Sequence, residues 1–369
     1  MSAKKIGFVG LGLIGGSIIR ALKAKHPDYR ITAFSRSQAP LLQAKEEGML
    51  DEITTTIDET FGSFDYIFLC TPVEYIAMYL EKIKPFISDT CVVTDVGSVK
   101  GYIHKAVEDL DMEANFIGGH PMAGSEKTGY ANSSALLLEN AFYAVTPTIK
   151  SNPEKVDEFV ELVRDMGAVP VVLDYRKHDF SVAGISHIPH IIASSLVNLV
   201  QDNDSEDQIM KMMAAGGFKD ITRIASSSPE MWEQICATNP EAIVDLLQKY
   251  IDSLTSFKND IEGKKKENIY KSFDRSKEYR DSIIDRKKGA KGPIQPIYSF
   301  YCDLVDEEGS IAMVASILAF KHLSIKNIGI VHYREFTRGA LLIEFYKEDA
   351  MNEAVLALRE RGYTIYTTE

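Results

Sequence analysis

Short apolar runs alternate with longer stretches of helical periodicity from residue 1 to about residue 175. This alternation predicts an α/β domain, a mostly parallel sheet with helices on both faces. Ligands of such sheets bind at the carboxyl ends of the strands. The expected strands are Ile6–Val9, Arg30–Phe34, Tyr66–Cys70, Cys91–Asp95, Asn115–Gly118, Ala141–Val145 and Val169–Leu173.

From about residue 176 to 284 the apolar spacing is helical throughout, which predicts an all-α domain. One apolar set is Ile188, Ile191, Ile192, Leu196 and Leu199, and a second is Ile243, Leu246, Leu247, Tyr250 and Leu254. A small bundle has too little interior for so many apolar faces, which favours a homodimer interface. A monomer with a compact helical domain is the alternative.

Residues 285–296 are rich in Lys, Gly and Pro and predict a solvated linker before a small third domain, residues 297–369. Its pattern has the order βαββαβ of the ferredoxin-like α+β fold. The expected elements are strands at Ile297–Leu304, Ile325–His332, Ala340–Phe345 and Thr364–Thr367 and helices at Ser310–Leu323 and Ala350–Arg361.

A glycine-rich turn follows the first expected strand and precedes a helix that runs through Lys25. Its sequence is Gly10-Leu11-Gly12-Leu13-Ile14-Gly15, the G-x-G-x-x-G pattern of a Rossmann dinucleotide-binding domain. Gly10 suits the tight turn, Gly12 the close approach of a pyrophosphate, and Gly15 the packing of helix on strand. A tight βα turn without a ligand is the other interpretation.

The second expected strand runs into Ser35-Arg36-Ser37 and lacks the acid that usually binds the ribose 2′-hydroxyl of NAD. Arg36 is suited to a 2′-phosphate, so the cofactor is NAD or NADP. A solvated arginine on an exposed loop is the alternative.

The amino-acid composition limits the kinds of partner that the protein is expected to bind. The 41 basic and 53 acidic residues give a net charge of −12, which argues against nucleic acid and anionic membranes. We expect a cytoplasmic protein, because no apolar run reaches the ~20 residues that span a bilayer and no cleavable signal is evident. Cys70, Cys91, Cys236 and Cys302 are scattered, which predicts buried thiols.

His120 lies in the segment Gly119-His120-Pro121-Met122-Ala123-Gly124-Ser125-Glu126, a glycine-rich turn after an expected strand. A neutral imidazole there can accept the proton of a substrate hydroxyl while hydride leaves the same carbon. A histidine bonded to its own loop is the other interpretation. Ser98, Ser125 and Glu126 nearby favour the catalytic one.

Lys219 and Arg223 are four residues apart and would share one face of a helix, beside Gly216 and Gly217. Two cations on one face suit a dicarboxylate, although a solvated basic face is the usual explanation. His187 and His190 have metal-ligand spacing without a third ligand, so we predict no metal site.

These motifs together resemble the prephenate dehydrogenases that carry a C-terminal ACT domain, over essentially the whole chain. The matching segments are Gly10–Gly16, Thr71-Pro72-Val73, Asp95-Val96-Gly97-Ser98, Gly119–Gly124, Ser186-His187-Ile188-Pro189-His190 and Asp220–Ala225. The implied reaction is oxidative decarboxylation of prephenate to 4-hydroxyphenylpyruvate, in tyrosine biosynthesis.

The resemblance also implies roles for residues. His120 would accept the hydrogen bond of the ring hydroxyl, Ser98 would orient it or the substrate, and Arg223 would bind a carboxylate. The remaining substrate pocket would be His187, Lys219, Ser125, Glu126 and Gly216, and the cofactor site would be Gly10, Leu11, Gly12, Leu13, Ile14, Gly15, Ser35, Arg36, Thr71 and Pro72.

The ACT-like domain implies an amino-acid effector, with tyrosine as the candidate because it is the pathway product. Glu308, Gly309 and Ser310 after its first strand, together with Asn327, would hold the effector. A domain that adds only dimer contacts is the alternative. For the whole chain the competing functions are an arogenate dehydrogenase and a catalytically silent nucleotide or amino-acid sensor.

Overall fold

The computed structural model describes residues 3–124, 127–284, 298–305, 307–331 and 340–367. The chain divides into two compact units, Met1–Ser272 and Phe273–Glu369, which are described separately below. The division falls inside helix α12 (Lys266–Ile284), so this helix contributes to both units.

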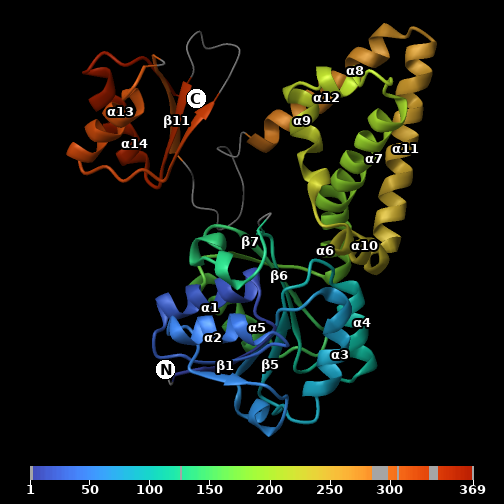
Figure 1. The fold of residues 1–369 in the computed structure, drawn as a ribbon, viewed down its shortest axis with the longest axis vertical. Helices are drawn as coiled ribbons and strands as arrows, with labels where there is room; N and C mark the ends of the chain where they lie inside the picture. Colours follow the sequence, from blue (N-terminus) through green and yellow to red (C-terminus); the bar gives the residue numbers. More distant parts are fainter. Residues whose placement is uncertain (1–2, 125–126, 285–297, 306, 332–339, 368–369) are drawn as a thin grey trace. The chain divides into compact units, whose positions relative to one another are not determined.

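The first unit is built on a five-stranded parallel sheet with the order β3-β2-β1-β4-β5 (Figure 1). Its strands are β1 Lys5–Val9, β2 Arg30–Phe34, β3 Glu52–Thr54, β4 Tyr66–Leu69 and β5 Val92–Asp95. The expectation of a mostly parallel sheet is confirmed. Strand β3 was not predicted, because three residues at the sheet edge are too short to show a period of two.

A second set of strands, in the order β6-β7-β8, continues beyond β5 through a parallel bridge between Val93 and Phe116. These strands are β6 Ile117–Pro121, β7 Phe142–Pro147 and β8 Val169–Val172, and only the pair β6 with β7 is antiparallel. The expected strand at Asn115–Gly118 therefore lies further along the chain. His120 belongs to the strand itself, which corrects its predicted place in a turn.

Helices cover both faces of this sheet (Figure 1). Alternate strand residues point to opposite faces, so Phe68 packs with α1 and α5, whereas Ile67 and Leu69 pack with α3 and α4. Burial of each such side chain contributes about 1.5–3 kcal/mol. The helices are α1 Leu13–Lys25, α2 Gln38–Glu46, α3 Val73–Ile83, α4 Gly101–Asp109 and α5 Pro153–Asp165.

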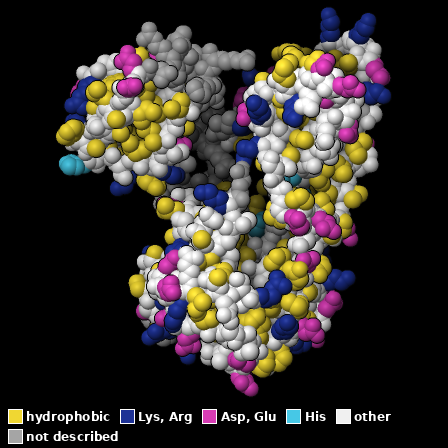
Figure 2. Space-filling view, viewed as in Figure 1, with side chains coloured by type: hydrophobic (Ala, Val, Ile, Leu, Met, Phe, Trp, Pro, Cys, Tyr) yellow, Lys and Arg dark blue, Asp and Glu magenta, His cyan; other side chains and the backbone are white. Residues whose placement is uncertain are grey.

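The helical segment follows, as predicted, and begins where Asp174 caps the amides of Arg176 and Lys177. It contains α6 Tyr175–Val182, a π-helical turn Ala183–His187, α7 Ile188–Asn203, α8 Ile209–Met213, α9 Gly216–Thr222, a 3-10 turn Arg223–Ser226, α10 Pro229–Thr238 and α11 Pro240–Glu262 before α12. Its fully buried apolar core is small, Ala183, Ile188 and Ile243. Many apolar side chains lie on its surface instead (Figure 2).

The continuous helical run Tyr175–Asn203 is, by length and composition alone, long and apolar enough to cross a membrane. The sequence analysis expected no apolar run long enough to span a bilayer. The difference arises because α6 continues into α7 through the π-helical turn without a break. Three of its polar side chains, His178, Asp179 and His187, are buried in this chain. We therefore interpret the run as a helix of the folded unit.

The second unit has a four-stranded antiparallel sheet with the order β10-β11-β9-β12. The elements are β9 Tyr298–Asp303, α13 Ser310–Phe320, β10 Asn327–Val331, β11 Ala340–Phe345, α14 Glu348–Arg359 and β12 Ile365–Thr367. Phe300, Ile343 and Leu358 are among its fully buried core residues. The element order βαββαβ agrees with the sequence prediction.

Candidate active site

The glycine turn connects the carboxyl end of β1 to the N-terminus of α1. Gly10 has a φ of +94°, and a Cβ there would lie 2.5 Å from the carbonyl oxygen of Cys70, so only glycine fits without strain. Gly15 lies tightly against the Cys70 side chain, where a Cβ would be 3.1 Å from the Cys70 Cβ. The turn and packing functions predicted for these two glycines agree with this geometry.

Gly12 differs from both neighbours, because a Cβ built on it would meet nothing within 4 Å. Open space in front of a backbone at a helix N-terminus suits a pyrophosphate, since free amides and the helix dipole attract anions. Thr71 supplies a second observation. Its buried hydroxyl has no hydrogen-bond partner among the described residues, and its methyl group would lie 3.0 Å from a Cβ on Gly10. The residues present therefore fit a dinucleotide.

The remaining predicted cofactor residues surround this turn. Leu11 is buried, Leu13 and Ile14 begin α1, and Pro72 precedes the first residue of α3. Ser35 accepts a bond from the amide of Ser37. The guanidinium of Arg36 lies over the Tyr75 ring at 5.3 Å, which holds this cation near the end of β2.

A buried ion pair connects β5 to β6. The Lys100 ammonium contacts the Asp95 carboxylate and donates to the carbonyl of Gly119 at 2.7 Å, and both charged side chains are fully buried. Asp95 also accepts from the amides of Gly97 (2.7 Å) and Gly119 (3.1 Å). Burial lowers the pKa of Lys100, and the Asp95 carboxylate opposes that shift. These bonds fix the residue before His120.

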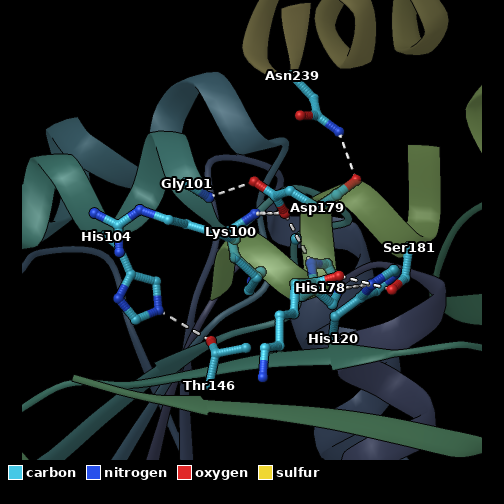
Figure 3. A network of polar contacts seen from close by, with 12 residues as sticks. Lys100, Gly101, His104, His120, Thr146, His178, Asp179, Ser181 and Asn239 are labelled. Atoms are coloured by element: carbon cyan, nitrogen blue, oxygen red, sulfur yellow. Dashed lines mark hydrogen bonds and ion pairs between the residues drawn. The ribbon is translucent and has the colours of Figure 1, made fainter. Parts of the chain in front are cut away.

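His120 is half-buried near the carboxyl end of β6 and contacts a second histidine from α6 (Figure 3). Its Nδ1 lies 2.8 Å from His178 Nε2, and His178 Nδ1 lies 2.8 Å from Asp179 Oδ1. Asp179 also accepts from the amides of Lys100 (2.8 Å) and Gly101 (2.6 Å) at the start of α4. Neither His178 nor Asp179 was predicted from the sequence.

Other buried polar groups of the helical segment lie next to this chain of bonds. The Asn239 amide donates to the Asp179 carbonyl at 3.0 Å and lies 3.4 Å from His187 Nδ1. His187 ends the π-helical turn and is 1% exposed, and its ring meets Trp232 edge-on. His190 stacks on Trp232 with ring centroids 3.8 Å apart. Both histidines therefore contact other side chains of this segment. The described residues contain no group of three metal-ligating side chains.

Burial keeps the imidazoles of His120 and His187 neutral at pH 7. Burial lowers the pKa of His120 well below its usual 6.5, and the nearby Lys100 ammonium reinforces the shift. Burial likewise lowers the pKa of His187 to about 4. At pH 7 the ring of His120 is therefore uncharged and can accept a proton.

Lys219 lies on α9 and Arg223 opens the 3-10 turn after it, so the expected single helix ends between them. Arg223 keeps helical dihedrals (φ −51°, ψ −40°), and both residues remain on one continuous helical path. Both side chains are exposed in this chain, and Gly216 begins α9. Ser98 is half-buried in the loop before α4, whereas Ser125 and Glu126 lie outside the described residues.

The predicted effector residues belong to the second unit. Gly309, with a φ of +88°, precedes α13, which Ser310 begins, and Glu308 is exposed beside them. Asn327 opens β10 opposite Glu344.

Comparison with known proteins identifies the family of this chain. The model for the prephenate dehydrogenase nucleotide-binding domain matches residues 18–172, and the model for the prephenate dehydrogenase dimerization domain matches residues 174–275. A prephenate dehydrogenase from Bacillus subtilis (strain 168) is 37% identical over 355 residues, which cover 96% of this chain and 95% of the relative. The chain belongs to the prephenate dehydrogenase family.

Two solved structures agree with that assignment. Prephenate dehydrogenase from A. aeolicus, in complex with hydroxyphenyl propionate and NAD+, is 30% identical with a TM-score of 0.72. Synechocystis arogenate dehydrogenase is 31% identical with a TM-score of 0.70. The alignments cover 99% of each of those chains but 77% and 76% of this one, so part of this chain has no counterpart in them.

Proposed function

We propose that this member of the prephenate dehydrogenase family oxidises prephenate to 4-hydroxyphenylpyruvate and carbon dioxide with NAD or NADP, in tyrosine biosynthesis. The observation that carries the proposal is the neutral, half-buried His120 beside the carboxyl edge of the sheet, the edge on which the glycine turn opens. Ligands of open α/β sheets bind along this edge.

A bound nicotinamide would accept hydride from the ring carbinol carbon. Gly10, Gly12 and Gly15 would form the pyrophosphate site with the N-terminus of α1. His120 would take the hydroxyl proton and can return it to the phenolic oxygen after carbon dioxide leaves, so the proton balance closes. Ser98 would orient the hydroxyl or the ring of His120.

The dianionic substrate needs fixed cations, and Arg223 with Lys219 would supply them. His187, Gly216, Ser125 and Glu126 would complete the pocket. Arogenate dehydrogenase is the second candidate, because the similarity to the Synechocystis enzyme is about as strong as that to the A. aeolicus enzyme. Arogenate has an amino group where prephenate has a keto group.

Mixing the purified protein with each pairing of NAD or NADP with prephenate or arogenate, and following absorbance of the reduced cofactor, tests this proposal. We expect the fastest reduction with prephenate. Reduction with arogenate alone would assign the second candidate, and no reduction with either substrate would refute both.

Replacing Arg223 with alanine is expected to raise KM for prephenate by ~10–100-fold, the equivalent of one charge-assisted hydrogen bond. The value of kcat should change less, because Arg223 would bind the carboxylate in the ground state as well as in the transition state. Steady-state kinetics measure both constants. Lys211→Ala, a matched cation on the neighbouring α8, should leave KM unchanged. Equal KM values for wild type and Arg223→Ala would place the carboxylate elsewhere.

Replacing Arg36 with aspartate is expected to move cofactor preference toward NAD by at least ~10-fold in the ratio of kcat/KM values, because a charge-assisted contact with the 2′-phosphate is lost. Arg36→Gln separates loss of the cation from gain of an anion, since it should lower NADP use and leave NAD use unchanged. If the wild type and both variants use NADP equally poorly, Arg36 contacts Tyr75 alone and has no function in cofactor choice.

We infer a soluble cytoplasmic homodimer. The helical domain matches a family dimerization domain, and its long helices expose apolar side chains, among them Leu199, Ile251, Leu254 and Phe273. A second copy is the partner that would bury them. The soluble state rests on the similarity to biosynthetic relatives, and the net charge of −12 argues against nucleic acid as a partner.

We infer four parts of the chain: a Rossmann domain (1–175), a helical substrate and dimerisation domain (176–284), a linker (285–296) and an ACT regulatory domain (297–369). The strand order β10-β11-β9-β12 supports the last of these. The effector would be tyrosine, held by Glu308, Gly309, Ser310 and Asn327.

A further inference from the structure

Asp179 is hydrogen-bonded to His178, and His178 is hydrogen-bonded in turn to the ring of His120 (Figure 3). Both side chains are buried, at 2% and 7% exposed. They come from α6, at the start of the helical segment, whereas His120 comes from the sheet. The contact therefore joins the two halves of the first unit at the proposed base.

Asp179 sets the direction of this path. Its Oδ1 accepts from the Lys100 amide and its Oδ2 from the Gly101 amide, and backbone amides can only donate. A carboxylate between such donors acts as an acceptor, so the proton shared with His178 belongs to His178 Nδ1. A His178 ring that carries only this proton has its lone pair on Nε2.

This assignment leaves one arrangement for His120. Its Nδ1 lies 2.8 Å from the lone pair of His178 Nε2, so Nδ1 carries the hydrogen and donates. The other ring nitrogen, Nε2, keeps its lone pair on the opposite edge of the ring. A histidine can act as a base only through the nitrogen that lacks a proton.

We propose that His178 and Asp179 are positioning residues that hold His120 in the Nδ1-protonated tautomer, so that Nε2 is the nitrogen that accepts the substrate proton. This inference rests on the proposed function of His120 as the base. The selection depends on α6 being seated against β6 and the start of α4. The base therefore becomes competent only when the helical segment is docked on the sheet.

Two substitutions of His178 separate positioning from packing, because their amides reach different places. The glutamine amide in His178→Gln can place an acceptor where Nε2 lies, whereas the shorter His178→Asn can bond only toward Asp179. We expect His178→Asn to lower kcat by about 100-fold, the scale of general-base catalysis, and His178→Gln to stay within ~10-fold of wild type. KM for prephenate should change less than kcat in both.

His104 offers a matched control, because it is another buried histidine, bonded to Thr146 and stacked on Tyr175, that does not contact His120. His104→Asn should therefore leave kcat near the wild-type value. Thermal unfolding midpoints of all three variants show how much stability each substitution removes, so that this loss can be separated from the loss of kcat. Equal losses of kcat in His178→Asn and His178→Gln, in proportion to lost stability, would show a packing role and overturn the proposal.

Nitrogen-15 NMR of histidine-labelled protein without substrate tests the tautomer directly. The two signals of His120 are identified by their absence in His120→Asn. We expect a protonated Nδ1 and an unprotonated Nε2 in the wild type, and a mixture of tautomers in His178→Asn. A protonated Nε2 in the wild type would refute the assignment even if the protein oxidises prephenate, whereas the predicted tautomer without turnover would refute only the function.

Discussion

The variant His120→Asn is expected to turn over prephenate at least ~100-fold more slowly than the wild type, the loss typical of a positioned general base. Asparagine keeps a polar side chain but has no basic nitrogen that can accept the hydroxyl proton. The glycine turn follows β1, whereas His120 belongs to β6, so the dissociation constant for NAD or NADP should change little. Stopped-flow and steady-state absorbance of the reduced cofactor measure kcat, and equilibrium titration measures cofactor binding.

The matched control is His104→Asn, which removes a second buried imidazole whose Nε2 lies 3.0 Å from Thr146 Oγ1. Turnover by this variant should stay near the wild-type rate once any loss of stability is taken into account. Near-normal turnover in His120→Asn would remove His120 from the chemistry. Weakened cofactor binding with an unchanged chemical step would instead give it a role in forming the nucleotide site.

The first domain was predictable because its signals are local. The glycine turn, the strand before it and the helix after it follow each other within 25 residues, and each constrains its neighbours. Burial of Phe8 and Val9 on opposite faces follows from a central parallel strand, which the run Ile6–Val9 already predicts. The βαββαβ order of the second unit was predictable for the same reason.

The arrangement around the base was not predictable, because it depends on long-range contacts. His178 is 58 residues from His120, and in the sequence it lies in the polar stretch Tyr175-Arg176-Lys177-His178-Asp179, which resembles any solvated helix start. Only the packing of α6 on the sheet buries it. A capping signal was present, since Asp174 precedes this helix, but capping predicts where a helix begins and not what it contacts.

His120 was predicted in a turn because the expected strand ended at Gly118 and the next residue, Gly119, resembles a loop residue. In the structure these glycines lie inside β6, where a Cβ on Gly119 would lie 2.6 Å from the Asp95 carbonyl and one on Gly118 would lie 2.3 Å from the Thr146 hydroxyl. Close approach of neighbouring strands thus explains both glycines, including Gly119, which the sequence assigned to a turn. The strand gives His120 a fixed backbone, which a loop would not.

Removal of the proposed ACT domain (residues 297–369) is expected to abolish inhibition by tyrosine while leaving the oxidation of prephenate intact. A protein truncated after about Lys288 keeps every described residue that we assign to the cofactor, the base and the substrate cations. Inhibition at a distance requires tyrosine to bind one arrangement of the domains better than another, typically by ~1–3 kcal/mol. Initial rates against tyrosine concentration, at fixed prephenate, measure the loss in the truncated enzyme.

Full-length variants distinguish an effector site from a general effect of truncation. Glu308→Ala and Asn327→Ala alter the turn before α13 and the first residue of β10, where the effector is expected. Each should raise the tyrosine concentration needed for half-inhibition, whereas Glu353→Ala, which removes an exposed carboxylate from α14, should not. Should the truncated enzyme be inhibited with unchanged potency, tyrosine must compete at the active site, because no other part of the proposed effector site would remain.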